Sequence, residues 1–190
     1  SSIGSMHLRL TEEQEALRDA VAGFLEKASS AEAVREAEPL GWDPKVWEGL
    51  TSIGVPTLGV SEDLGGSGAS LRDLAVVAEA CGARLAPAPV VETMVAARLL
   101  SRFAATSTDA AATLSVLADG GAPVTLALRP AVAGPAALVP GAALAASVIA
   151  LDGADLALFT SLIHLLRCRR SPPCRSPWSP SPSQKNTDNH

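Results

Sequence analysis

The stretch from Gly54 to Gly82 constrains the fold of this chain more than any other, because it combines a helix end, a glycine-rich loop and a helix start. Gly54 follows apolar residues at helical spacing and stands where a left-handed C-terminal cap is needed, and Pro56 prevents the helix from continuing. Ser70 and Asp73 are typical of an N-cap followed by an acidic first turn. The stretch therefore predicts two helices joined by a compact loop.

Three glycines of that loop, Gly65, Gly66 and Gly68, permit positive φ values and close approach of the backbone. A tight turn between helices is the interpretation that this composition favours. A phosphate cradle is the alternative, but the spacing matches neither G-x-G-x-x-G after a strand nor a loop that ends in Gly-Lys-Ser/Thr. A helix N-terminus behind Ser70 could still attract an anion.

Helical periodicity extends on both sides of the loop. Thr11 with Gln14 forms a capping-box pattern, and Asp43-Pro44 gives an N-cap followed by proline at the first helical position. Asp109 is expected to cap the last helix, which Gly120 ends. We expect helices at about 11–28, 30–37, from 44 to the residue before Gly54, 70–81, 90–103 and 109–118.

The apolar positions of these helices predict the core. In the 70–81 helix the buried stripe is expected to be Leu71, Leu74, Val77 and Cys81. The 90–103 helix is apolar on more than one side, so we expect it to be internal. Its two stripes are Val91, Val95, Leu99 and Phe103 on one side, and Met94, Ala97 and Leu100 on the other. Trp42 and Trp47 are expected to be packing residues rather than ligand stackers.

From Ala122 onward the period changes to that of strands. Short apolar runs at 124–128, 146–151 and 154–159 are separated by glycine and proline turns, and Asp152-Gly153 predicts a hairpin between the last two. The expected fold is therefore mainly α, with a small β part at its C-terminal side.

Charge and composition exclude some classes of protein. Up to Thr160 the chain has 10 Lys and Arg against 19 Asp and Glu, whereas the segment from Ser161 has 5 against 1. An acidic body argues against nucleic acid as the ligand. The longest uncharged run, Pro130–Leu151, is broken by prolines and glycines and makes a poor membrane span. With no signal-like segment in residues 1–5, which resemble a vector remnant, we expect a cytoplasmic protein that binds no membrane.

The three cysteines do not form a disulfide framework in a chain of 190 residues. Cys81 lies on an apolar stripe and is expected to be a small buried residue. Cys168 and Cys174 lack the paired spacing of a structural zinc site, so we predict no metal site.

Several segments resemble the N-terminal helical domain of acyl-CoA dehydrogenases. The run Val60-Ser-Glu-Asp-Leu-Gly-Gly-Ser-Gly68 is similar to the Pro-Glu-x-x-Gly-Gly-x-Gly loop of that family, and Leu10–Arg18 and Leu85–Thr93 are similar to its flanking segments. The resemblance covers about Met6 to Thr160. It implies an acyl-CoA dehydrogenase-like N-terminal helical bundle at 6–121, followed by an incomplete β domain at 122–160 and an Arg/Pro/Ser-rich tail at 161–190.

The family catalyses α,β-desaturation of acyl-CoA thioesters in fatty acid or sterol side-chain metabolism: a carboxylate takes the α proton and FAD accepts the β hydride. Its catalytic Glu comes from a C-terminal helical domain that has no counterpart here, so no catalytic residue is carried over. Glu79 and Glu92 are expected to be satisfied or solvent-facing carboxylates.

By the same resemblance, five residues of the 90–103 helix are expected to face an acyl chain: Glu92, Thr93, Met94, Ala96 and Ala97. Gly65, Gly66 and Gly68 form the family-signature loop. The alternative is that these five side chains pack only against protein. The family's Thr-Glu and Gly-Ser-Asp flavin segment does not follow Val124, so FAD is expected in the intact family member and not on this chain alone.

Two functions remain open at this point. In the first, the chain is the N-terminal portion of an acyl-CoA dehydrogenase or of its non-catalytic heteromer subunit. It is then expected to be inactive alone and to work as a homo- or hetero-oligomer with acyl-CoA dehydrogenase subunits. In the second, it is a helical interaction module that pairs with a full-length dehydrogenase through the 90–103 helix. The tail is either a natural disordered segment or the product of a frameshift near Thr160, and the unfinished β domain favours the frameshift.

Overall fold

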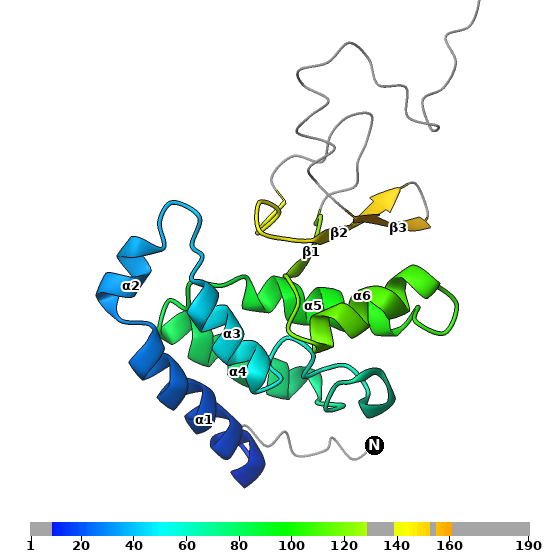
Figure 1. Cartoon of the computed structure of the whole chain (residues 1–190). Coiled ribbons are helices and arrows are strands. Elements are labelled where there is room, and N and C mark those ends of the chain that lie inside the picture. The colour runs from blue at the N-terminus through cyan, green and yellow to red at the C-terminus, as the bar shows by residue number, and fades with distance from the viewer. Residues whose placement is uncertain (1–8, 129–138, 153–154, 161–190) are drawn as a thin grey trace, which may run out of the picture.

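A computed structural model describes residues 9–128, 139–152 and 155–160, and it is mostly helical (Figure 1). The elements are α1 (Glu12–Ala28), α2 (Ala31–Glu36), α3 (Pro44–Ser52), the short 3₁₀ turn η1 (Glu62–Leu64), α4 (Leu71–Ala83), α5 (Val90–Ser101), α6 (Thr108–Ala118), β1 (Val124–Leu126), β2 (Ser147–Asp152) and β3 (Asp155–Thr160). This order confirms the mainly α class with a small β part, and each predicted helix and strand is present.

Local capping explains where α1 and α4 begin. Thr11 and Gln14 form a capping box at α1, and Ser70 and Asp73 form a second one at α4. The two boxes are joined, because Gln14 Nε2 donates a 2.7 Å hydrogen bond to Asp73 Oδ1. The N-termini of two helices that are far apart in sequence therefore lie side by side.

Other helix ends follow the predicted signals with one exception. Asp43 caps α3, and Gly54 beyond its end has a φ of 75°. The cap of α6, however, is Ser107, whose side chain accepts from the Ala110 N–H, while Asp109 lies in the first turn. The prediction of Asp109 as the cap is wrong, because the turn after α5 places Ser107 in the extended conformation that an N-cap requires.

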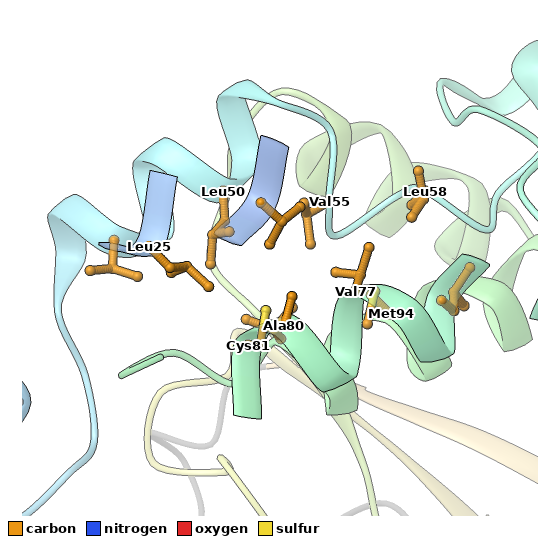
Figure 2. Close-up of a cluster of buried hydrophobic side chains, with 12 residues drawn as sticks. Leu25, Leu50, Val55, Leu58, Val77, Ala80, Cys81 and Met94 are labelled. Atoms are coloured by element: carbon orange, nitrogen blue, oxygen red, sulfur yellow. The ribbon is translucent and has the colours of Figure 1, made fainter. Parts of the chain in front are cut away.

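The helices bury two apolar clusters. The first gathers α1, α3, α4 and the start of α5, with Leu25, Leu50, Val77 and Cys81 at its centre (Figure 2). The second lies between Trp47, α5, α6 and the sheet, and includes Ala97, Leu114, Val124 and Ile149. The β strands thus share a core with the helices, and the sheet lies over α5 and α6 (Figure 1).

The sheet has the strand order β1-β2-β3. β2 and β3 are antiparallel with Asp152 opposite Asp155, which confirms the predicted hairpin between them. β1 instead pairs in parallel with β2, with Val124 opposite Ser147. Among the described residues β3 is an edge strand, because it pairs with β2 alone.

Two predictions of burial are wrong. Leu71 was expected in the buried stripe of its helix, but its side chain is 67% exposed; it is the first residue of α4, and the buried stripe of this helix begins at Leu74. The α5 helix is not internal on both sides. Val91 and Val95 are each 44% exposed and Phe103 is 42% exposed, because α4, α6 and β1 cover only the other side of the helix.

Several predictions fall wholly or partly outside the described residues: the vector remnant at 1–5, part of the uncharged run 130–151, Cys168, Cys174 and the tail 161–190. None of the helices that the structure describes is long and apolar enough to cross a membrane.

Candidate functional site

The glycine loop is a tight, self-satisfied turn. Gly65 and Gly68 have φ values of 84° and 65°. Gly66 is needed for space, because a Cβ there would lie 2.1 Å from the Val60 carbonyl oxygen. The Gly66 N–H donates to Ser61 O at 3.1 Å and the Gly68 N–H to Val60 O at 2.7 Å. With these amides used inside the loop, the turn interpretation holds and a phosphate cradle is disfavoured.

Arg98 connects this loop to α5. One guanidinium nitrogen, Nη1, donates to Ala69 O at 3.0 Å and to Gly59 O at 3.4 Å. Gly59 and Ala69 are the residues at the two ends of the loop, so a single side chain of α5 holds both ends. Sequence reasoning missed this role, because no local pattern shows which distant carbonyl groups an arginine reaches.

The residues predicted to face an acyl chain lie mostly in the core. Met94 packs in the first cluster, and Ala96 and Ala97 pack in the second. Thr93 is completely buried and its hydroxyl donates to Pro89 O at 2.8 Å. Glu92 is half-buried at the start of α5. These contacts are with protein, and the contact of the five residues with an acyl chain stays a prediction.

An open apolar pocket of about 490 Å³ lies beside the C-terminal half of α5, and Leu99 and Leu100 of this helix contribute to its lining. It is formed where the C-terminal half of α5 and the start of α6 meet the β2–β3 hairpin. Ser107, Ala110 and Ala157 contribute small side chains to the wall. The larger lining residues are Leu99, Leu100, Phe103, Ile149, Leu156 and Leu158.

Acidic and cysteine side chains offer no catalytic centre on these helices. Glu79 is exposed and faces solvent as expected. Burial raises the pKa of the Cys81 thiol from 9.0 to about 11, so this thiol is neutral and unreactive at neutral pH. Within the described ranges, no group of three His, Cys, Asp or Glu residues is placed to hold a metal ion.

The family profile described as "Acyl-CoA dehydrogenase, N-terminal domain" matches residues 11–120, which include every described helix. The chain belongs to the acyl-CoA dehydrogenase family. Its curated relatives include the acyl-CoA dehydrogenase IpdE2 of Mycolicibacterium smegmatis, 38% identical over 124 residues, which are 64% of this chain and 38% of the relative. IpdE2 of Mycobacterium tuberculosis is 38% identical over 122 residues, 63% of this chain and 37% of that protein.

Solved structures of acyl-CoA dehydrogenases have the same fold. The ChsE4-ChsE5 complex from Mycobacterium tuberculosis superimposes with a TM-score of 0.66 and 25% identity, over 82% of this chain and 48% of that chain. A variant of the Tcur3481-Tcur3483 steroid acyl-CoA dehydrogenase gives a TM-score of 0.65 at 23% identity, over 78% of this chain and 47% of that chain. The chain thus spans about 38% of the curated relatives and about half of the solved chains that it matches.

Acyl-CoA dehydrogenases in general use FAD, but the β1 region does not fit a flavin. The Thr125 hydroxyl is fully buried and donates to Pro140 O, at 2.6 Å. The Ala127 N–H donates to Ile149 O at 2.7 Å, so this amide is used within the sheet. The Thr125 hydroxyl and the Ala127 N–H are therefore both used within the chain itself.

The pocket is the feature of this acyl-CoA dehydrogenase chain that sequence reasoning did not find. The spacing of Leu99 and Phe103 already placed them on one stripe of the predicted 90–103 helix. The spacing cannot show that Leu156 and Leu158 of a distant strand lie opposite them, because the pairing of α5 with the hairpin is set by tertiary packing.

Proposed function

We propose that this chain is the N-terminal portion of a FAD-dependent acyl-CoA dehydrogenase, or of its non-catalytic heteromer subunit, and that it is inactive alone. The match of the N-terminal domain profile over residues 11–120 carries the proposal. Its substrate class is an acyl-CoA thioester, oxidised between the α and β carbons. In this proposal the chain binds part of the acyl group, while the catalytic carboxylate and FAD are supplied by other parts of the assembly.

The fit of the residues supports this division of labour. α,β-Desaturation needs a carboxylate within hydrogen-bond reach of the α carbon in a water-poor site. Glu79 is exposed and Glu92 lies at the helix start away from the apolar pocket lining, so neither meets this requirement within the described chain. The Thr125 hydroxyl and the Ala127 amide are occupied by Pro140 and Ile149.

An assembly with other acyl-CoA dehydrogenase subunits is part of the proposal. Among solved structures with this fold, ChsE4-ChsE5 is described as a complex, and Tcur3481-Tcur3483 is named for two components. The exposed Val91 and Val95 of α5, with Phe103 just beyond its end, give the chain an apolar surface that an assembly would cover.

The test compares the purified chain with the same chain co-expressed with a catalytic acyl-CoA dehydrogenase subunit. We expect no flavin absorbance and no oxidation of acyl-CoA by the chain alone, measured with an artificial electron acceptor. In co-expression we expect a stable complex and turnover. A yellow preparation of the chain alone that oxidises acyl-CoA would contradict the proposal.

The second candidate function is a helical interaction module that pairs with a full-length dehydrogenase through α5, and the 44% exposure of Val91 and Val95 favours it. The variant Val95→Glu places a charge on this surface, and the control is Leu71→Glu at an exposed position of α4. An interaction module loses the complex in gel filtration with Val95→Glu while the partner enzyme keeps its full activity without the chain. A required subunit instead loses complex and turnover together.

We also propose the division of the chain into 6–121, 122–160 and 161–190, with a frameshift near Thr160 and vector residues at 1–5. Sequencing the coding DNA beyond the codon for Thr160 tests this proposal. Another open reading frame that encodes strands and a helical domain supports it, and stop codons in every frame contradict it.

We also propose that the protein is cytoplasmic, and the free thiol of Cys81 supports this location. Cell fractionation checks this location.

A further inference from the structure

We propose that two copies of this chain associate through β3, by antiparallel pairing of the outer edge of β3 with the same edge in the second copy. The two sheets then form one continuous sheet with the strand order β1-β2-β3-β3-β2-β1 around a two-fold axis. This inference goes beyond the proposed function, which names other acyl-CoA dehydrogenase subunits as partners, and it does not depend on that function.

The direction of the backbone groups in the sheet carries the first step. Ile149 O accepts from the Ala127 N–H at 2.7 Å, so the N–H and C=O groups of Ile149 point toward β1. Since Ile149 lies opposite Leu158, this pair exchanges no hydrogen bonds, and the N–H and C=O groups of Leu158 point away from β2. Those of Leu156, two residues earlier, point the same way. In the part of the chain that the structure describes, no strand pairs with that side of β3.

The strand lacks the features that usually protect such an edge. Its sequence, Asp-Leu-Ala-Leu-Phe-Thr, contains no lysine and no proline, and its register with β2 runs without a bulge. Leu156 and Phe159 are 43% and 45% exposed and lie on opposite faces of the sheet. An edge that is apolar on both faces and has unpaired backbone groups is a template for another strand.

The position of charge along β3 favours a second copy in the antiparallel direction. Asp155, the one charged residue of the strand, is its first residue. Parallel pairing in register would place two Asp155 carboxylates side by side, whereas antiparallel pairing puts them at opposite ends. The register that pairs all three outward-facing residues, Leu156, Leu158 and Thr160, puts Leu158 opposite Leu158 and Leu156 opposite Thr160. The strand is therefore complementary to itself.

The open pocket beside α5 supports the same contact. Leu156 and Leu158 line it from β3, and Phe103 lines it from the turn after α5. Both pockets would lie on the same face of the joined sheet, next to the two-fold axis. None of the lining residues is charged, so covering them removes apolar surface from water without desolvating an ion.

The experiment measures the mass of the full chain in solution by sedimentation equilibrium over a range of protein concentrations. We expect a reversible equilibrium between one and two chains. Amide hydrogen exchange, followed by NMR at low and high concentration, locates the contact: exchange at Leu156 and Leu158 should slow as dimers form. The N–H of Ala157 faces β2, so its exchange should change far less.

Two variants at one position test the edge. Leu156→Pro removes an outward-facing N–H and leaves the pairing with β2 intact, and Leu156→Lys adds a charge of the kind that protects natural edges. Each should weaken dimerisation at least about tenfold. Leu71→Lys adds the same charge at an exposed leucine of α4 and should dimerise like the unmodified chain. Circular dichroism checks folding, and the lysine variant alone suffices if the proline variant does not fold.

Three results would overturn the inference. The first is a chain that stays single at every concentration, whether the Leu156 and Leu158 amides exchange fast or are already protected. The second is a dimer that persists in both Leu156 variants. The third is a dimer that is lost with Val95→Glu and kept with Leu156→Lys, which assigns the contact to α5. The complex with a catalytic subunit is measured separately, so either proposal can fail while the other stands.

Discussion

Asp73 supports two helices with one carboxylate. Oδ2 accepts from the Ser70 N–H at 2.8 Å, and Oδ1 accepts from Gln14 Nε2. Replacing it with alanine removes one half of the α4 capping box, the bond from the Ser70 N–H, together with the link to α1. We expect Asp73→Ala to lower the free energy of unfolding by about 1–2 kcal/mol, measured by urea denaturation.

The control is Asp63→Ala, at an exposed carboxylate, which should change stability by less than about 0.5 kcal/mol.

Hydrogen bonds from Ser70 and Gln14 lower the pKa of Asp73 below its ordinary value. The stabilisation that the Asp73 carboxylate gives the folded chain is therefore present above the ordinary carboxyl pKa, and it is lost as the pH falls through the lowered pKa of Asp73. Equal stability of Asp73→Ala and the unmodified chain at neutral pH would refute this role.

Cys81 makes the core sensitive to alkaline pH. Its pKa is raised by burial to about 11 in the folded chain, against 9.0 for an ordinary thiol. The thiol ionises at lower pH in the unfolded chain than in the folded one. The stability that comes from keeping it neutral in the core is therefore complete below pH 9 and is lost as the pH rises to about 11. We expect urea midpoints to fall across this interval, and Cys81→Ala to flatten the fall. The chain has no tyrosine that would titrate over the same range, and an unchanged slope in Cys81→Ala would contradict the assignment.

At the scale of an element, the glycine loop tolerates no side chain at Gly66. A Cβ there would overlap the carbonyl oxygens of Val60 and Thr57, at 2.1 and 2.5 Å. We expect Gly66→Ala to lower the free energy of unfolding by about 2–4 kcal/mol, since backbone must move. Gly23→Ala is the matched control, because α1 leaves open space there. It should stabilise the chain by about 0.5–1 kcal/mol in the same urea experiment. Similar effects of the two variants would contradict this account.

Helix starts and ends were the part of the fold that sequence could predict. Thr11, Ser70 and Gly54 act through residues no more than four positions away, so their signals are complete in the local sequence. Ser107 was missed because its role depends on the conformation of the turn before α6. The same limit applies to the candidate site. Spacing grouped Leu99 with Phe103, but the opposite wall comes from β3, and the parallel partner of β1 lies more than twenty residues away.

At the scale of the whole molecule, Trp47 joins the helices to the sheet. Its indole Nε1–H donates to Gly121 O at 3.1 Å, three residues before β1, and its ring lies in the second core cluster. We expect Trp47→Phe to cost about 1–3 kcal/mol, because it removes the hydrogen bond and leaves the Gly121 carbonyl without this donor. Hydrogen exchange should become faster at Thr125 and Leu126.

Trp42→Phe is the control. Trp42 is half-buried, and the centroid of its ring lies 5.8 Å from that of Trp47. It should leave exchange in β1 unchanged. Faster exchange in β1 with Trp42→Phe but not with Trp47→Phe would show that ring packing, and not the Gly121 hydrogen bond, joins the two parts.

The first core cluster has a consequence for how the protein is made. Its buried members run from Val21 to Met94, and none comes from the sheet. The sheet, by contrast, needs β2 before β1 can pair at all. A ribosome that adds about 5–20 residues per second therefore releases a helical bundle able to close its own core seconds before the last strand is synthesised. During that interval the helical part of the nascent chain can already be folded. The strands that are synthesised last then pack against an α5 helix that has already formed.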